Sequence, residues 1–88
     1  MAYIVNYLET AKWTYFKLIP ADKKLLIKRV IEERLTQDPQ AFGKPLRGSL
    51  KGHYRLRIED YRIIYRVNGN VVLVIAIGHR KDIYNDYR

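Results

Sequence analysis

The chain has 88 residues and a formal net charge of +8, with 17 Lys and Arg against nine Asp and Glu. This length allows one domain with a single core, spanning residues 1–88, and a hydrophobic content of 48% argues against disorder. The absence of cysteine excludes disulfides and thiolate metal sites, and no apolar run approaches the ~18 residues of a membrane span.

The N-terminal half of the chain predicts a strand followed by two helices. Residues 2–8 alternate loosely between apolar and polar, which indicates a short strand. Apolar residues then recur every three and four positions over residues 9–19, a helical period that Pro20 interrupts. A second helix follows, with an apolar stripe that includes Ile27 and Ile31, and it ends at Asp38-Pro39. We expect the two helices to be antiparallel and to cover one face of a sheet.

The C-terminal half predicts a loop, an antiparallel meander and a short tail. Residues 40–49 contain two glycines and a proline and indicate the loop. Asn68-Gly69 is a strong two-residue hairpin signal. The last strand is continuously apolar, so we expect it to be central and buried on both faces. The predicted strands are residues 51–58, 61–67 and 70–77, and the tail is residues 78–88. The predicted fold class is α+β, with one sheet and helices on one of its faces.

Positive charge is concentrated in the stretch from Lys44 to Arg66, which carries seven Lys and Arg against two acids. A two-residue turn at Glu59-Asp60 would place Arg57 directly opposite Arg62. Like charges in such a pair destabilise a sheet, so the pairing favours an anion between them over a merely solvated strand face. Arginine matches phosphate bidentately, and RNA is the first candidate. The arginines that would share this face are Arg55, Arg57, Arg62 and Arg66, and Arg80 follows the last strand.

Other residues that could carry chemistry are few. Of the two histidines, His79 has the better position, at the end of the last strand. Tyr84 lies in the polar tail just beyond the basic strands, with Tyr87 as a near substitute. The carboxylates form no metal-ligand spacing, so we predict no metal and no cofactor.

Several motifs together resemble the RelE/ParE superfamily of toxins from type II toxin–antitoxin systems, and the RelE branch most of all. They are Asp38-Pro39, Lys44-Pro45-Leu46-Arg47-Gly48, Tyr54-Arg55-Leu56-Arg57, Asp60-Tyr61-Arg62-Ile63-Ile64-Tyr65 and Ile77-Gly78-His79-Arg80. The resemblance covers nearly the whole chain. It implies metal-independent, ribosome-dependent cleavage of mRNA in the decoding site.

The resemblance also implies roles for individual residues. The expected catalytic residues are Arg57, Arg62, Arg80 and Tyr84, with Tyr84 as the general base. The expected substrate-binding residues are Lys44, Arg47, Lys51, Arg55, His79 and Lys81. In the RelE branch the two cations of the first meander strand are lysines, whereas this chain has Arg55 and Arg57. The general acid therefore stays open, with His79 as one candidate.

The implied partners are a RelB-like antitoxin, mRNA in the ribosomal A site and ribosomal RNA, with no membrane. A heterotetramer is one assembly that toxin and antitoxin could form. We see no signal peptide, which favours a cytoplasmic protein. Two other functions stay open: a ParE-type inhibitor that binds DNA gyrase without catalysis, and a basic RNA-binding module without activity.

Overall fold

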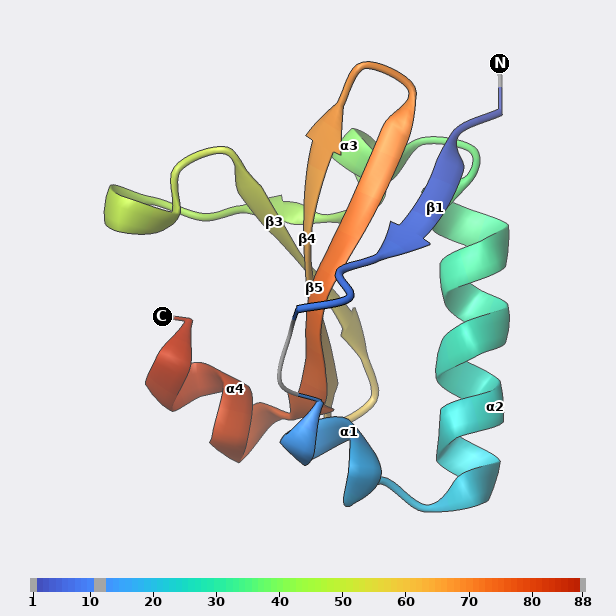
Figure 1. Ribbon diagram of the computed structural model, residues 1–88, viewed down its shortest axis with the longest axis vertical. Coiled ribbons are helices and arrows are strands. Elements are labelled where there is room, and N and C mark those ends of the chain that lie inside the picture. The colour runs from blue at the N-terminus through green and yellow to red at the C-terminus, as the bar shows by residue number, and fades with distance from the viewer. Residues whose placement is uncertain (1, 11–12, 88) are drawn as a thin grey trace.

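The sheet has five strands in the order β1-β5-β4-β3-β2. In the computed structural model, which describes residues 2–10 and 13–87, β1 is parallel to β5 and the remaining neighbours are antiparallel (Figure 1). The last strand of the meander is central, as predicted, because β1 and β4 flank it. The strands are β1 (Ile4–Tyr7), β2 (Lys44–Pro45), β3 (His53–Ile58), β4 (Tyr61–Asn68) and β5 (Val71–His79). The α+β fold class is thereby confirmed.

One long helical segment covers one face of the sheet. It begins as α2 (Ala21–Val30) and continues as a π-helical segment, η1 (Ile31–Leu35). The predicted apolar stripe is buried here and packs on alternate residues of β3, β4 and β5 to form the main core. The other helical segments are α1 (Thr14–Lys17), α3 (Pro39–Phe42), η2 (Gly48–Leu50) and α4 (Arg80–Asp86). No helix within the described ranges is long and apolar enough to cross a membrane.

The first predicted helix is much shorter than its periodicity indicated. The pattern predicted residues 9–19, whereas α1 covers Thr14–Lys17; residues 11 and 12 of that prediction lie outside the described part. Its N-cap, Trp13, makes no capping side-chain hydrogen bond, and aromatic or β-branched residues have weak helix propensity. The side chains also diverge, because Phe16 packs on the main core and Tyr15 on a second cluster. Tertiary packing therefore holds α1 in place.

The predicted loop at residues 40–49 is partly regular. Helix α3 starts at Pro39, which suits the first turn of a helix, and the Asp38 side chain accepts a hydrogen bond from the Ala41 N–H at 3.3 Å. The chain then forms β2, an edge strand that the sequence did not predict, paired with β3. A loop prediction over the whole stretch was wrong because these short elements depend on neighbours that are distant in sequence.

The predicted tail is a helix, and it lies on the opposite face of the sheet from α2 (Figure 1). Ile83 of α4 packs with Ile64 and Ala76 in the second buried cluster. A β-bulge makes this possible: Ile64 pairs with Ala76 but Tyr65 pairs with Val74, so one residue of β5 has no opposite partner. The bulge turns Ala76 toward α4. The sheet therefore carries a helix on this face as well as on the face where the sequence predicted helices.

Candidate active site

The turn between β3 and β4 builds the centre of the candidate site. Its register is the predicted one, with Ile58 opposite Tyr61 and Arg57 opposite Arg62. Glu59 adopts a φ of 53°, which closes the chain within two residues. The turn also fixes Arg62, whose Nη1 donates hydrogen bonds to the carbonyl oxygens of Glu59 at 3.0 Å and Tyr61 at 2.9 Å.

The same turn holds the start of α4. The Arg80 backbone N–H donates to the Asp60 carbonyl oxygen at 2.7 Å, and Arg80 Nε lies 3.9 Å from Asp60 Oδ1. The Glu59 carboxylate points elsewhere, to Lys23 of α2 at 2.7 Å, and this bond raises the pKa of Lys23. The turn thus brings Arg80 close to the arginines of the hairpin, although Arg80 lies far from them in the sequence.

The arginines are close enough to oppose one another electrostatically. The pKa of Arg62 is lowered, first because burial removes solvent from the guanidinium and then because Arg57, Arg55 and Arg80 repel its charge. Asp60 acts in the opposite direction but does not reverse the shift. A bound anion would relieve this repulsion.

A groove of about 940 Å³ collects these side chains. All four residues predicted to be catalytic line it, together with Lys44, Arg55 and Lys81 from the predicted binding set. Tyr84 projects from α4 with 56% of its surface exposed. Tyr87 also reaches the groove but is half-buried against the second cluster, so Tyr84 is the more accessible phenol.

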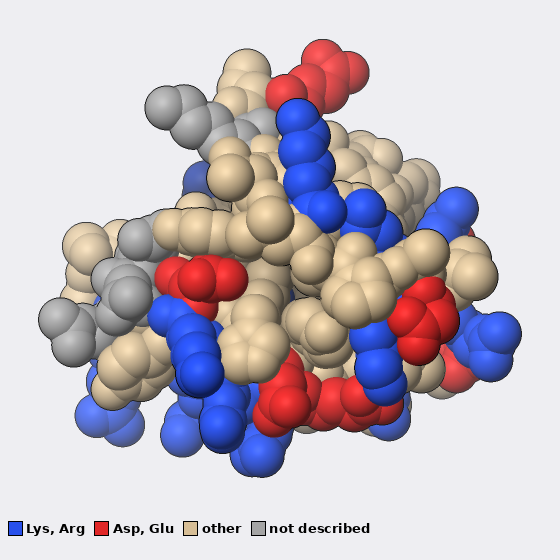
Figure 2. All heavy atoms as spheres, turned by 90° about the horizontal axis from the view of Figure 1, so that it is seen from below, with Lys and Arg blue, Asp and Glu red and all other residues tan. Residues whose placement is uncertain are grey.

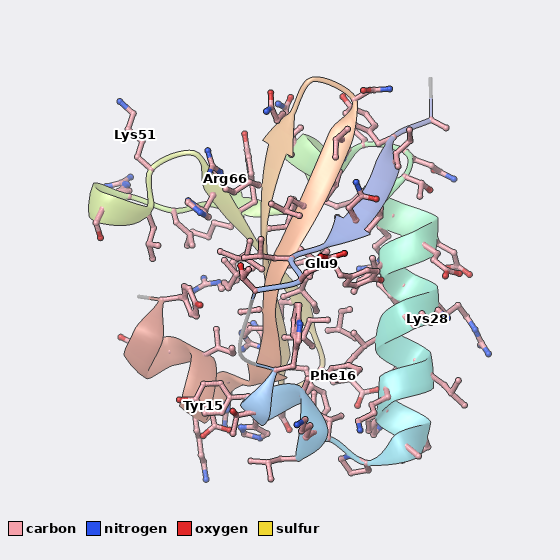
Figure 3. The ribbon with its side chains drawn as sticks, viewed as in Figure 1. Glu9, Tyr15, Phe16, Lys28, Lys51 and Arg66 are labelled. Carbon is pink, nitrogen blue, oxygen red and sulfur yellow. The ribbon has the colours of Figure 1, made fainter. Side chains whose placement is uncertain are left out.

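Other predicted residues are not brought to this groove. Arg47 and Lys51 do not line it, and Lys51 projects outward at the far end of the molecule (Figure 3). Arg66 of the predicted basic face is also outside, on β4 opposite His53. His79 instead caps α4, where its Nδ1 accepts a hydrogen bond from the Lys81 N–H at 3.2 Å. Its ring packs edge-on against Tyr61, with 5.8 Å between the ring centroids.

Four lining residues were not among those predicted from the sequence: the apolar Leu56 and Ile83, and the pair Arg34 and Phe42. Arg34 of η1 and Phe42 of α3 border the groove near Arg57, and the Arg34 Cζ atom lies 5.7 Å from the centroid of the Phe42 ring. Arg34 was not singled out on the predicted second helix, and Phe42 fell within the predicted loop. No local pattern signals that these two residues meet, because α3 decides their placement.

Positive charge also extends beyond the groove. Figure 2, a view of the end where α1 and α4 lie, shows Lys and Arg side chains gathered along the surface with fewer carboxylates between them. Within residues 2–10 and 13–87, no group of His, Asp or Glu side chains could hold a metal ion. The chemistry available in the groove is therefore that of guanidinium, ammonium and phenol groups.

A second groove, of about 790 Å³, lies away from the arginines, between α1, α2 and β1. Its walls are mainly apolar and include Tyr7, Trp13 and Leu25, of which Leu25 is 68% exposed. Burial and the nearby Glu32 raise the pKa of Tyr7. Phe16 also lines this groove and lies between α1 and α2 in Figure 3. The cations on the rim are Lys17, Lys24 and Lys28.

Comparison with known proteins gives the chain its family. A family model described as the ParE toxin of the type II toxin–antitoxin system parDE matches residues 6–84. Toxin RelG of Mycobacterium tuberculosis is 33% identical over 86 residues, which cover 96% of this chain and 98% of RelG. Toxin RelE3 of Methanocaldococcus jannaschii is 33% identical over 73 residues, covering 78% and 82% of the two chains.

Solved structures agree with this assignment. The toxin–antitoxin complex RelBE2 from Mycobacterium tuberculosis contains a chain that matches with a TM-score of 0.81 and 27% identity, covering 91% of this chain and 100% of that one. A mutant of E. coli RelE in the free state matches with a TM-score of 0.64 and 27% identity, covering 99% and 95%. The fold and these relatives define a toxin of a type II toxin–antitoxin system. The chain belongs to the RelE/ParE family of such toxins, which confirms the resemblance drawn from its sequence motifs.

Proposed function

We propose that this toxin is an endoribonuclease that cleaves mRNA in the ribosomal A site. The observation that carries the proposal is the convergence of Arg55, Arg57, Arg62 and Arg80 with Tyr84 on one groove. RNA cleavage develops negative charge on a phosphate, and preorganised cations are the groups that stabilise such charge.

In the proposed reaction, the RNA 2′-hydroxyl attacks the adjacent phosphorus. The O2′–P bond forms and the P–O5′ bond breaks, which leaves a 2′,3′-cyclic phosphate and a 5′-hydroxyl. Tyr84 acts as the base in its phenolate form, which the surrounding arginines favour, and this phenolate takes the proton of the 2′-hydroxyl. The exposed position of Tyr84 leaves it accessible to substrate. Arg57 and Arg62 stabilise the phosphorane, while Arg55 and Arg80 position the backbone.

The leaving O5′ also needs a proton. Arginine is a poor donor because guanidinium stays charged at neutral pH. The hydrogen bond from Lys81 to His79 and the place of His79 outside the groove favour a structural role for that ring. We therefore assign the acid to water or to ribosomal RNA, which agrees with a requirement for the ribosome.

A ParE-type inhibitor of DNA gyrase is the alternative, because the matching family model is that of ParE toxins. Inhibition by binding alone would not require Arg55, Arg57, Arg62 and Arg80 to converge on one groove, where their charges oppose one another. The relatives named RelG and RelE3 also favour the RelE branch. We therefore prefer the nuclease.

The test is expression of the chain in cells, with mRNA 5′ ends mapped at translated codons. We expect Arg62→Ala and Tyr84→Phe to lower cleavage by about 100-fold or more, the usual effect of losing a group that stabilises the transition state. Arg66→Ala is the matched control, since Arg66 lies on the same strand outside the groove.

Each other outcome has a distinct meaning. Growth arrest without new mRNA ends would refute the nuclease, and accompanying DNA damage would indicate gyrase. Undiminished cleavage in both variants would show that the protein is a nuclease but that Arg62 and Tyr84 are not its catalytic residues. A loss in Tyr87→Phe but not in Tyr84→Phe would transfer the role of base to Tyr87.

We also propose that a RelB-like antitoxin binds the groove between α1, α2 and β1. Complexes of RelB with RelE, including one from Methanococcus jannaschii that matches with a TM-score of 0.69 and 27% identity, support a cognate antitoxin. Apolar walls with Lys17 and Lys24 on the rim fit an amphipathic segment that carries carboxylates beside its apolar face.

Co-purification with the antitoxin encoded beside the toxin gene tests this surface. Leu25→Asp places a charge in the apolar wall, and we expect it to lower the amount of antitoxin retained. Leu18→Asp is the control, since Leu18 is 71% exposed and does not line the groove. Equal retention by both variants would place the antitoxin elsewhere.

A further inference from the structure

Phe42 is an aromatic side chain without a place in either hydrophobic core. It is 47% exposed, and neither the main core nor the second cluster includes it. A cation lies over its ring, with Arg34 Cζ 5.7 Å from the ring centroid. The ring is therefore presented at the surface by α3 and η1.

The position of Phe42 places this ring beside the candidate active site. Lys44 pairs with Arg55 in the antiparallel β2–β3 ladder, so the residues that precede Lys44 lie toward Arg57. Among the described residues, no strand pairs with Arg57 on that edge of β3. Leu56, Phe42 and Arg34 line the same groove as the arginines. One continuous surface therefore joins the predicted phosphate-binding residues to an exposed aromatic ring.

The surroundings of Phe42 favour a particular kind of ligand. An apolar protein segment on this ring would have to desolvate Arg34, Lys44 and Arg57, which line the same groove. Single-stranded nucleic acid meets both requirements, because its bases stack on aromatic rings and its phosphates pair with cations. Arg34 also lies in a π-helical segment, a rare element that is frequently found at functional sites.

We propose that Phe42 and Arg34 form a stacking platform for the RNA base next to the scissile phosphate. This inference rests on the proposed function, since it assigns part of the substrate to the same groove. The platform would hold one base at the side of the groove while Arg57 and Arg62 hold the phosphate. Stacking on an aromatic face accepts every base, so the platform would position the strand without selecting a sequence.

The test uses the purified toxin and a short single-stranded RNA that carries 2-aminopurine, whose fluorescence falls when it stacks. We expect the wild type to quench the probe at low salt. Phe42→Leu keeps an apolar side chain but loses the π face, and it should weaken binding about 5- to 100-fold and abolish quenching. Phe42→Trp should retain both, and Arg34→Lys should weaken binding without unfolding the chain.

The control is Leu18→Ala, an exposed apolar residue outside both grooves that should leave RNA binding unchanged. Absence of quenching by the wild type, or equal affinity of Phe42→Leu, would overturn the platform. So would a Phe42→Leu variant that loses only antitoxin binding. If Phe42→Leu leaves quenching unaffected while Arg62→Ala still abolishes mRNA cleavage in cells, the proposed platform is wrong and the proposed nuclease activity is retained. If neither Arg62→Ala nor Tyr84→Phe alters cleavage while quenching depends on Phe42, RNA binds here but the catalytic assignment fails.

Discussion

Replacing Arg57 with glutamine should make the protein more stable and less active at the same time. Arg57 lies opposite Arg62 on the neighbouring strand and is one of the charges that lower the Arg62 pKa. Among the described residues it makes no hydrogen bond or ion pair that the change would remove. Glutamine keeps much of the side chain and deletes the charge, so the variant isolates the repulsion.

The size of the effect follows from the geometry and exposure of the pair. Cross-strand pairs contribute roughly 0.2–1 kcal/mol, and like charges directly opposite are unfavourable. Arg57 is exposed, so solvent screening reduces its effect on stability. We therefore expect the free energy of unfolding to rise by about 0.5 kcal/mol at low salt, which corresponds to about 2–4 °C in Tm for a domain of this size. Loss of a transition-state contact should lower mRNA cleavage by about 100-fold.

Urea and thermal unfolding at two salt concentrations measure the stability effect. The Debye length falls from about 10 Å at 0.1 M salt to about 3 Å at 1 M, so the two proteins should converge at high salt. Arg66→Gln, which changes an exposed arginine opposite His53, is the matched control and should gain less. A loss of stability in Arg57→Gln at low salt would refute the repulsion argument, and so would a gain that persists in 1 M salt.

Two further predictions concern packing and pH. Gly78→Ala should destabilise the fold by about 1–3 kcal/mol in urea unfolding, because its Cβ would lie 2.8 Å from Tyr15 Cβ and 3.1 Å from Ile83 Cδ1; an unchanged free energy of unfolding would show that these helices move aside easily. Tyr65→Phe should lower the free energy of unfolding by about 0.5–1.5 kcal/mol at pH 8, because the Tyr65 hydroxyl donates a hydrogen bond to the carbonyl oxygen of Pro39. Burial raises the pKa of Tyr65 in the folded state. The contribution of Tyr65 to the free energy of unfolding is therefore complete below the unfolded pKa of about 10 and is lost as pH rises through the folded pKa. Between pH 8 and pH 11, Tyr65→Phe should lose less stability than the wild type, and an equal loss would contradict this reasoning.

The parts of the site that the sequence predicted are those set by local geometry. A two-residue turn fixes the register of a hairpin, so the pairing of Arg57 with Arg62 followed from Glu59-Asp60 alone. Arg80 and Tyr84 were singled out by their positions after the last strand, and the family resemblance implied their catalytic roles. The structure brings both to the same groove as the hairpin arginines. His79 caps α4 and does not line the groove, a position that its place at the end of the last strand did not reveal.

The α+β pattern, the main helical stripe and the charged hairpin follow from the sequence alone, because each depends on residues a few positions apart. The face that α4 covers depends on tertiary packing, since a bulge in β5 turns Ala76 toward Ile83. Tertiary packing also decides that Arg34 and Phe42 border the groove of Arg57. These contacts join segments that are far apart in the chain, and packing between them provides the energy. Hydrophobic periodicity within one segment does not show which distant segment it packs against.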